Sequence, residues 1–388
     1  MFFRPLPWEY AIRNLFRRPT RTLLTLLGLT TVIVLVFVVV GFIRGLEQSL
    51  ATSGDPRVVL VFSQGMGENL EYSSIDMKVA DEVPASLEGI QQRYGRKYVS
   101  PELFLGTQIR TSAESEPGFG LVRGVTPGVL DVRSQVELEQ GRWPKTNEVM
   151  VGRLAATKLG LTAEQLRIGS PLVFESRTWT ISGIYSAGGS VFESEVWCRL
   201  DDLQQAMKRQ DLSLVAMTLG PGGDFADVAL LCGERLDLEL MALPEMEYYA
   251  SLQKDYGPVR WLAWLVVVLV SAAGVFAGLN TMYGAVVGRV SEVASLRTLG
   301  FVRRAVVISL IQEGVVLAAA ASLLATVVAF LLVNGAAIRF TMGAFELHID
   351  NMAILIGCST GLLLGCLGAI PPAVRAVRQP IVDGLKTA

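Results

Sequence analysis

The chain has 388 residues, of which 51% are hydrophobic, and a formal net charge of −2 at pH 7. This composition is too apolar for one soluble domain, yet a long stretch of ordinary composition is also present. The chain therefore combines strongly apolar segments with a segment of ordinary composition. The single histidine rules out a histidine-rich zinc site, and no basic aromatic surface indicates nucleic-acid binding. No P-loop sequence occurs, so this chain cannot bind ATP through that motif.

The first segment of the chain is basic and amphipathic. Its apolar side chains recur at helical spacing and are Trp8, Ile12, Leu15 and Phe16. Arginines occupy the opposite side of the same helix. This pattern predicts a helix within 1–21 that lies on the inner membrane face and ends at Pro19. A basic topology signal alone is compatible with the same residues.

Four apolar blocks follow along the chain. They cover Leu23–Ile43, Trp261–Val287, Ala305–Val333 and Met352–Ile370. Each is close to the ~20 residues that span a ~30 Å hydrocarbon core as a helix, the form in which a backbone satisfies its own polar groups in lipid. We therefore expect transmembrane helices at 22–44, 259–288, 305–334 and 351–370. The first should remain as an anchor, because no small-residue cleavage site clearly follows it.

The small net charge hides a strong charge asymmetry. Residues 45–258 contain 19 lysines and arginines against 30 aspartates and glutamates, whereas the remainder contains 15 against 6. Arginines cluster before the first span, within 289–304 and in the tail 371–388, while the loop 335–350 has only Arg339. The positive-inside rule therefore predicts that both termini and 289–304 are cytoplasmic and that 45–258 lies outside.

The long segment 45–258 has the pattern of a folded domain. Strand-like runs alternate with helix-like runs, the former at 58–62, 148–151 and 178–184 and the latter at 201–207 and 224–235. Helical periods next to the membrane predict stalk helices at both ends of the segment. The expected fold is therefore an α-helical membrane protein with four transmembrane helices and an extracytoplasmic α+β domain inserted between helices 1 and 2.

Two side-chain patterns invite a covalent or catalytic role. The compartment permits a disulfide between Cys198 and Cys232, although two cysteines form no framework. Residues 357–361 match Gly-x-Ser-x-Gly, but a nucleophile elbow needs a strand-to-helix turn, and Ser359 lies in an unbroken apolar run. On one helix Ser359 would be about 16 Å from His348, so we expect its hydroxyl to bond its own helix.

Polar and small residues inside the predicted spans indicate contacts between helices. Glu313 lies in the third block, where a carboxylate is costly; it either pairs with a neighbouring helix or sits near the headgroups, and we favour a structural role. Small residues spaced four apart allow close helix approach, in a dimer or within one subunit. The expected packing positions are Gly274, Gly278, Gly361 and Gly365.

The segment 289–304 is the most informative part of the sequence. Val293, Leu296 and Leu299 share one helix face, and a glycine follows where a helix would end. A short amphipathic helix between two spans suits docking to a soluble partner, and a plain interfacial connector would explain the pattern equally well. The residues expected to contact a partner are Glu292, Val293, Leu296, Arg297, Leu299 and Gly300.

This segment resembles MacB/FtsX-like permeases of the type VII ABC class, which carry a motif like Arg-x-x-Glu-Ile-Gly-x-Leu-Arg-Ala-Leu-Gly. It is matched by Arg289, Glu292, Val293, Leu296, Arg297, Leu299 and Gly300. The chain departs from the motif mildly, with Val293-Ala294 in place of Ile-Gly and Thr298 in place of Ala. The resemblance extends to 11–28, 312–314 and 371–385, and to 141–152 and 159–172 within the outer domain.

The resemblance implies a permease subunit of the bacterial cytoplasmic membrane that is not itself an enzyme and needs no cofactor, because a separate cytoplasmic ABC ATPase binds the ATP. Two permease copies, identical or different, would pair around two ATPases in the bilayer, with or without a periplasmic adaptor. The helix within 289–304 would couple ATP-driven motion to the outer domains, for export, extraction of lipoproteins or lipids, or regulation of a cell-wall enzyme. The alternative is a membrane-anchored sensor or scaffold without an ATPase.

Overall fold

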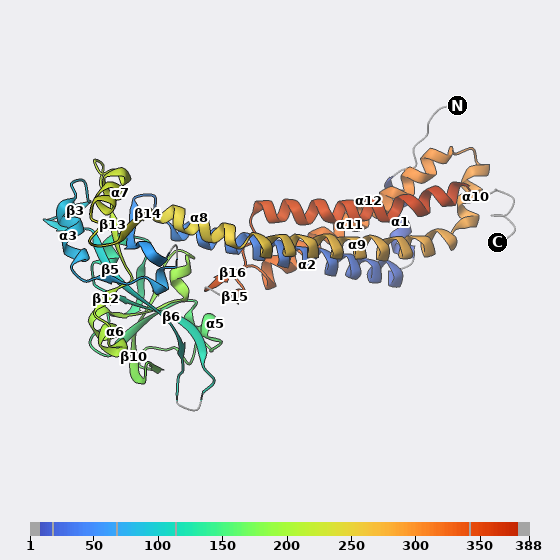
Figure 1. Cartoon of the computed structure of the whole chain (residues 1–388). Helices are drawn as coiled ribbons and strands as arrows, with labels where there is room; N and C mark the ends of the chain where they lie inside the picture. Colours follow the sequence, from blue (N-terminus) through green and yellow to red (C-terminus); the bar gives the residue numbers. More distant parts are fainter. Residues whose placement is uncertain (1–7, 18, 67–68, 113–114, 341–342, 379–388) are drawn as a thin grey trace. The chain divides into compact units, whose positions relative to one another are not determined.

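The computed structural model describes residues 8–378 except 18, 67–68, 113–114 and 341–342 (Figure 1). Parts of the predicted cytoplasmic segments, 1–7 and 379–388, therefore lie outside the described residues. The chain divides into two compact units. The first contains Met1–Arg44, Pro258–Ala336 and Leu347–Ala388, and the second contains Gly45–Gly257 and Ala337–Glu346.

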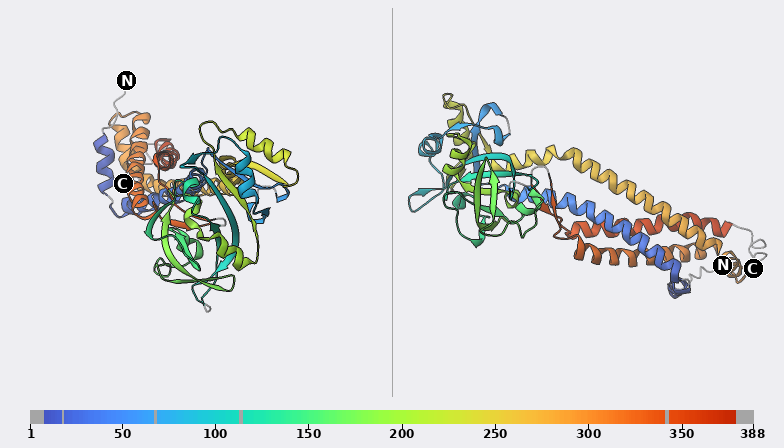
Figure 2. Two further views of the ribbon diagram at one scale, coloured as in Figure 1. Left: turned by 90° about the vertical axis from the view of Figure 1, so that its left-hand side faces the viewer. Right: turned by 90° about the horizontal axis from the view of Figure 1, so that it is seen from below.

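The first unit is helical. Its helices are α1 (Trp8–Arg17), α2 (Pro19–Ser53) as far as Arg44, α9 (Gly257–Val287), α10 (Val290–Thr298), α11 (Arg303–Leu332) and α12 (Asn351–Arg378). Among the described residues, four helices are long and apolar enough to cross a membrane: α2, α9, α11 and α12. They run alongside one another (Figure 2). The four predicted apolar helices are thus present, and α2 begins at Pro19, just after the end of α1.

Glycines set the spacing between these helices. A Cβ atom added to Gly361 would clash with the Ser322 hydroxyl of α11, and one added to Gly365 would clash with Ala318. On α9, a Cβ at Gly274 would lie 2.9 Å from Val32 of α2. Small residues thus let these backbones approach closely within one chain, which is one of the two roles that the sequence left open. Gly278 lies on the same side of α9, opposite Gly368 of α12.

The second unit is built on one mixed sheet of ten strands. The order is β14-β1-β13-β5-β6-β11-β8-β10-β7, with β9 also paired to β10. The pairs β6/β11 and β8/β10 are parallel and the other pairs are antiparallel. The strands are β1 (Val58–Ser63), β5 (Val99–Ile109), β6 (Gly118–Val125), β7 (Glu137–Gly141), β8 (Glu148–Gly152), β9 (Pro171–Phe174), β10 (Arg177–Ser186), β11 (Val196–Arg199), β13 (Leu214–Thr218) and β14 (Leu240–Pro244).

Short strand pairs and helices complete the second unit. The pairs are β2 (Ile75–Asp76) with β12 (Asp211–Leu212), β3 (Gln92–Arg93) with β4 (Arg96–Lys97), and β15 (Ala337–Arg339) with β16 (Ala344–Glu346). The α-helices are α3 (Val79–Ser86), α4 (Val129–Val132), α5 (Ala155–Leu159), α6 (Leu200–Met207), α7 (Phe225–Glu234) and α8 (Glu245–Asp255). The single-turn helices are η1 (Gln64–Met66), η2 (Leu70–Tyr72) and η3 (Val191–Ser194).

The sheet has an apolar core on each face. Strand β1 supplies both cores, because successive side chains of a strand point to opposite faces. Val59 and Val61 join one cluster, whereas Leu60 and Phe62 join the other. The unit thus combines helices with a mixed, mostly antiparallel sheet that is covered on both faces, in keeping with the α+β class that the local patterns suggested.

The two cysteines of the second unit are not bridged. Cys198 and Cys232 are both buried free thiols. Burial raises the pKa of Cys232 to about 11 and raises that of Cys198 further still. Because the thiolate is the reactive form, neither side chain is suited to exchange or nucleophilic chemistry near neutral pH.

Candidate functional site

Helix α10 is held between two well-defined ends. Arg289 precedes its first residue, and the helix stops because Gly300 adopts a left-handed backbone with φ of +92°. Glycine accepts that conformation without the steric penalty of a Cβ atom. The chain then turns back, with the Phe301 amide donating to the Leu296 carbonyl at 3.2 Å. The helix end expected at Gly300 is therefore present.

The inner face of α10 packs against its own subunit. Val293 is only 7% exposed and belongs to an apolar cluster with residues of α11 and α12, such as Val306 and Ala373. Leu296 is half-buried at the edge of the same cluster. Val293 is one of the residues predicted to contact a partner. In the single chain α11 and α12 cover its side chain, and a contact with a partner stays a prediction.

Leu299 follows the last residue of α10 and lies outside this packing. Its side chain is 76% exposed. Glu292 and Gly300 are also exposed, and Arg297 is half-buried. An apolar side chain presented between charged groups is a plausible anchor for a partner groove. The exposed part of the predicted contact set is therefore Glu292, Leu299 and Gly300, with Arg297 and Leu296 beside it.

A buried ion pair links the start of α10 to α11. Arg289 Nη1 lies 2.8 Å from Glu313 Oε2 of α11, and both side chains are only 8% exposed. Arg289 Nη2 also donates to the backbone carbonyl of Asn14 in α1, at 3.4 Å. One guanidinium therefore links three helices at the start of α10. The structural role predicted for Glu313 is thus present, and its partner is the first residue of the motif that contains α10.

Further contacts join α1 to α2 and α10. The Thr22 hydroxyl of α2 donates to the Leu15 carbonyl of α1 at 2.7 Å, and Arg21 of α2 donates to the Thr281 carbonyl of α9 at 3.0 Å. An ion pair between Arg17 of α1 and Glu292 of α10 is longer, at 3.9 Å, and exposed, so it contributes little to stability. The buried bond from Arg289 and the part-buried bond from Thr22 are therefore the stronger contacts of α1.

The alternative catalytic reading finds no support in the geometry. The Ser359 hydroxyl donates to the Ile356 carbonyl of its own helix at 3.0 Å, as expected for a serine in an apolar span. Among the described residues no group of three histidine, cysteine, aspartate or glutamate side chains is placed to hold a metal ion.

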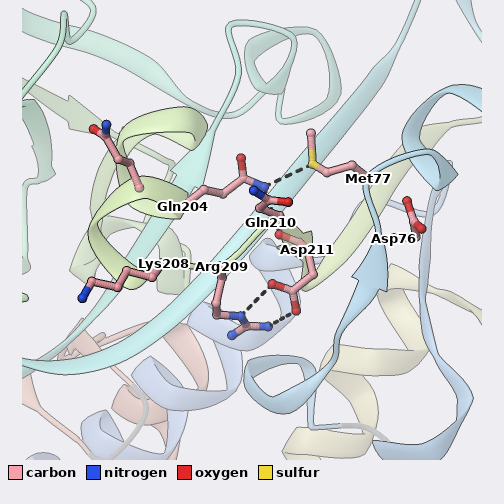
Figure 3. Close-up of a pocket in the computed structure, with 8 residues that line it drawn as sticks. Asp76, Met77, Gln204, Lys208, Arg209, Gln210 and Asp211 are labelled. Carbon is pink, nitrogen blue, oxygen red and sulfur yellow. Dashed lines mark hydrogen bonds and ion pairs between the residues drawn. The ribbon is translucent and has the colours of Figure 1, made fainter.

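The second unit has an open polar hollow of about 1030 Å³ beside α6 (Figure 3). Arg209 pairs with Asp211 at 2.6 Å in the lining of the hollow. Gln204 donates to the Asp211 carbonyl at 3.0 Å and to the Met77 sulfur. These three polar side chains therefore bond within the lining itself.

Four membrane-length helices, a short helix after the second of them and a separate unit of mixed sheet and helices together define a multi-pass membrane protein with a second folded domain. The sequence matches the family described as MacB-like periplasmic core domain over residues 22–229, which is more than half of the chain. The chain belongs to this family, and thereby to the MacB/FtsX-like permeases of ABC transporters.

The comparison with solved structures gives matches of low sequence identity and low TM-score. The periplasmic region of MacB from Actinobacillus actinomycetemcomitans has 12% identity and a TM-score of 0.40, covering 54% of this chain and 97% of that one. The extracellular domain of the noncanonic ABC-type transporter YknZ from Gram-positive bacteria has 14% identity and a TM-score of 0.37, covering 48% of this chain and 99% of that one. No curated protein matches the sequence.

Proposed function

We propose that this chain is the non-catalytic permease subunit of an ABC transporter and that a separate cytoplasmic ATPase drives it. The observation that carries the proposal is the short helix α10. The exposed apolar side chain of Leu299 lies at its C-terminal end, and the buried Arg289–Glu313 ion pair lies at its N-terminal end. A partner groove that receives Leu299 would bury its side chain. The ion pair would keep α10 in place against α11 while the partner moves. ATP would be bound by the partner, so the chain would need no cofactor of its own.

The proposal places the chain in the bacterial cytoplasmic membrane with both termini and α10 on the cytoplasmic side. The arginines before α2, around α10 and at the end of α12 favour this orientation. The second unit would then lie outside. Two copies of the permease, or this chain and a different one, would pair around two ATPases, and an adaptor outside the membrane is compatible with the arrangement.

The contacts around Arg289 suggest how a movement of α10, the proposed docking helix, would be passed to neighbouring helices. A displacement of α10 would act on Glu313 and so on α11, because the pair is buried and short. It would also act on α1 through the Asn14 carbonyl. The work delivered outside would be export, extraction of lipoproteins or lipids, or regulation of a cell-wall enzyme.

The decisive experiment replaces Leu299 with Asp. A carboxylate buried in a partner groove without a counter-charge costs on the order of several kcal/mol, a large share of a typical interface energy. We expect Leu299→Asp to insert normally, to lose ATPase during co-purification and to abolish transport-linked ATP hydrolysis. Leu299 is a better target than Leu296, because Leu296 also packs within its own subunit.

The matched control is Leu230→Asp, the same change at an exposed leucine of α7 in the second unit. This variant should retain the ATPase in wild-type amounts. If Leu299→Asp also retains it, α10 is not the docking helix. Absence of any ATPase from purified wild-type protein would favour a sensor or scaffold instead.

A further inference from the structure

A partly open cavity of about 220 Å³ lies in the second unit, between the sheet and the two helices α2 and α8. Its walls are largely apolar and aromatic. They include Leu50, Phe104, Tyr248, Tyr249, Leu252 and Tyr256. Ligand pockets for drug-sized molecules run from ~300 to ~1,000 Å³, so this cavity suits a smaller molecule.

The inner end of the cavity is a buried ionic cluster. Arg123 pairs with Glu195 at 2.5 Å through one nitrogen and with Glu102 at 2.5 Å through another. Arg133 approaches Glu102 at 3.4 Å and pairs with Glu245, the first residue of α8. All five side chains are almost fully buried. Except for Glu102, which lies behind them, each of these residues lines the cavity.

This cluster is not balanced in charge. Two arginines face Glu102, Glu195 and Glu245, and Glu71 adds a fourth carboxyl group at the cavity wall. Burial raises the pKa of Glu71, an effect that Lys158 opposes and Glu195 reinforces. The cavity is therefore surrounded by more carboxyl groups than guanidinium groups, which disfavours an anionic occupant and favours a cationic one.

One polar atom in the cavity wall also lacks a partner. The Nε atom of Arg133 is buried and has no hydrogen-bond partner among the described residues. A buried N–H group without an acceptor carries its full desolvation cost, which a ligand acceptor atom would relieve. The aromatic walls already accommodate positive charge, because the Arg123 guanidinium lies 4.1 Å from the centre of the Phe104 ring.

We propose that this cavity binds a small organic cation with an apolar body and a hydrogen-bond acceptor. The apolar body would lie against Leu50 and Leu252, and its amine would face the tyrosine rings and the excess carboxylates. The acceptor would meet the Arg133 Nε–H group. This site is independent of the proposed coupling to an ATPase, because its residues all belong to the second unit.

Isothermal titration calorimetry on the full chain in lipid nanodiscs tests the proposal, with empty nanodiscs subtracted. The probe is para-methoxyphenethylamine, which carries an amine, an aromatic body and an ether oxygen. We expect saturable binding of one probe per chain. The corresponding alcohol should bind roughly tenfold more weakly because it lacks the charge, and the corresponding propanoate should not bind. The amine with an ethyl group in place of the ether should lose several-fold affinity.

Two pairs of variants locate the binding to the cavity. Leu252→Trp fills the cavity and should abolish binding, whereas Leu230→Trp places the same ring on an exposed helix surface and should not. Glu71→Gln removes one carboxylate from the wall and should weaken binding several-fold, whereas Glu88→Gln, at an exposed position, should have no effect. Equal affinity for the alcohol and the amine, tighter binding of the propanoate or wild-type binding by Leu252→Trp would each overturn the proposal.

Discussion

Arg289 and Glu313 form the clearest single interaction of the helical unit. Each charge has lost most of its contact with solvent, and the 2.8 Å pair together with the Asn14 carbonyl compensates for that loss. A buried ion pair adds little net stability compared with two apolar residues, but removal of one partner leaves the other charge exposed to the full desolvation penalty. The pair is therefore better suited to fix a geometry than to stabilise the fold.

This asymmetry gives a residue-scale prediction. Glu313→Leu leaves Arg289 buried and unpaired and should destabilise the protein by roughly 3–5 kcal/mol. Glu313→Gln should be milder, because its amide oxygen still accepts a hydrogen bond from the guanidinium. The double variant Arg289→Met with Glu313→Leu should recover most of the loss. Thermal unfolding in detergent measures all three, and equal loss in the leucine and glutamine variants would argue against pairing.

The sequence predicted a structural role for Glu313 but not its partner. An isolated carboxylate in an apolar block signals a missing counter-charge. Arg289 lies in a different helical segment, and only the packing of α10 against α11 brings the two together. The burial of Val293 against α11 and α12 was not predicted, for the same reason. Helical spacing shows which residues share a face, but it does not show whether that face meets a partner or the protein's own helices.

At the scale of elements, α11 and α12 pack along a line of small residues. Gly361 and Gly365 of α12 face Ser322 and Ala318 of α11, and no space remains there for a side chain. Such contacts replace the hydrophobic effect between helices, because lipid tails are as apolar as leucine. The close approach of these backbones therefore depends on individual glycines.

Gly361→Val tests this dependence. The added side chain would force α11 and α12 apart, and overpacking of this kind typically costs roughly 1–3 kcal/mol. We expect a lower unfolding temperature and a lower yield of folded protein. Gly284→Val on α9 is the matched control, because nothing lies within 4 Å of a Cβ atom at that glycine. Similar behaviour of both variants would indicate that β-branching, not packing, causes the change.

Several elements of the second unit could be predicted individually, but their arrangement could not. The strand-like runs at 58–62, 148–151 and 178–184 all lie within observed strands, because alternation and β-branched residues are local signals. The pairing of β6 with β11, in contrast, joins segments more than 70 residues apart. No local pattern specifies such a pairing, which is why the parallel pairs were not foreseen.

At the scale of the whole molecule, one short segment between two membrane-length helices folds with the second unit. Residues 337–346, expected to be part of a short outer loop, belong to the second unit. They form the hairpin β15–β16, and Glu346 pairs with Arg153 at 3.2 Å. The Lys158 ammonium group also donates to the Phe340 carbonyl at 3.0 Å. So short a segment gives no sequence signal for a partner that distant in the chain.

The two-sided charge distribution leads to a prediction about orientation. The second unit carries the excess of acidic residues, whereas arginines flank the ends of α2 and α12 and surround α10. A membrane-impermeant maleimide should therefore label Leu236→Cys in intact spheroplasts, because Leu236 is an exposed residue of the second unit. It should label Ser295→Cys, on the exposed side of α10, only after permeabilisation.

The native thiols should not obscure this result. Cys198 and Cys232 are buried, and their raised pKa values leave little reactive thiolate at neutral pH. The unsubstituted protein supplies the background, which also accounts for Cys358 and Cys366 in α12. Labelling of Ser295→Cys from outside would place α10 on the side where no ATP is available. The docking helix could not then meet a cytoplasmic ATPase, and the proposed function would fail together with the orientation.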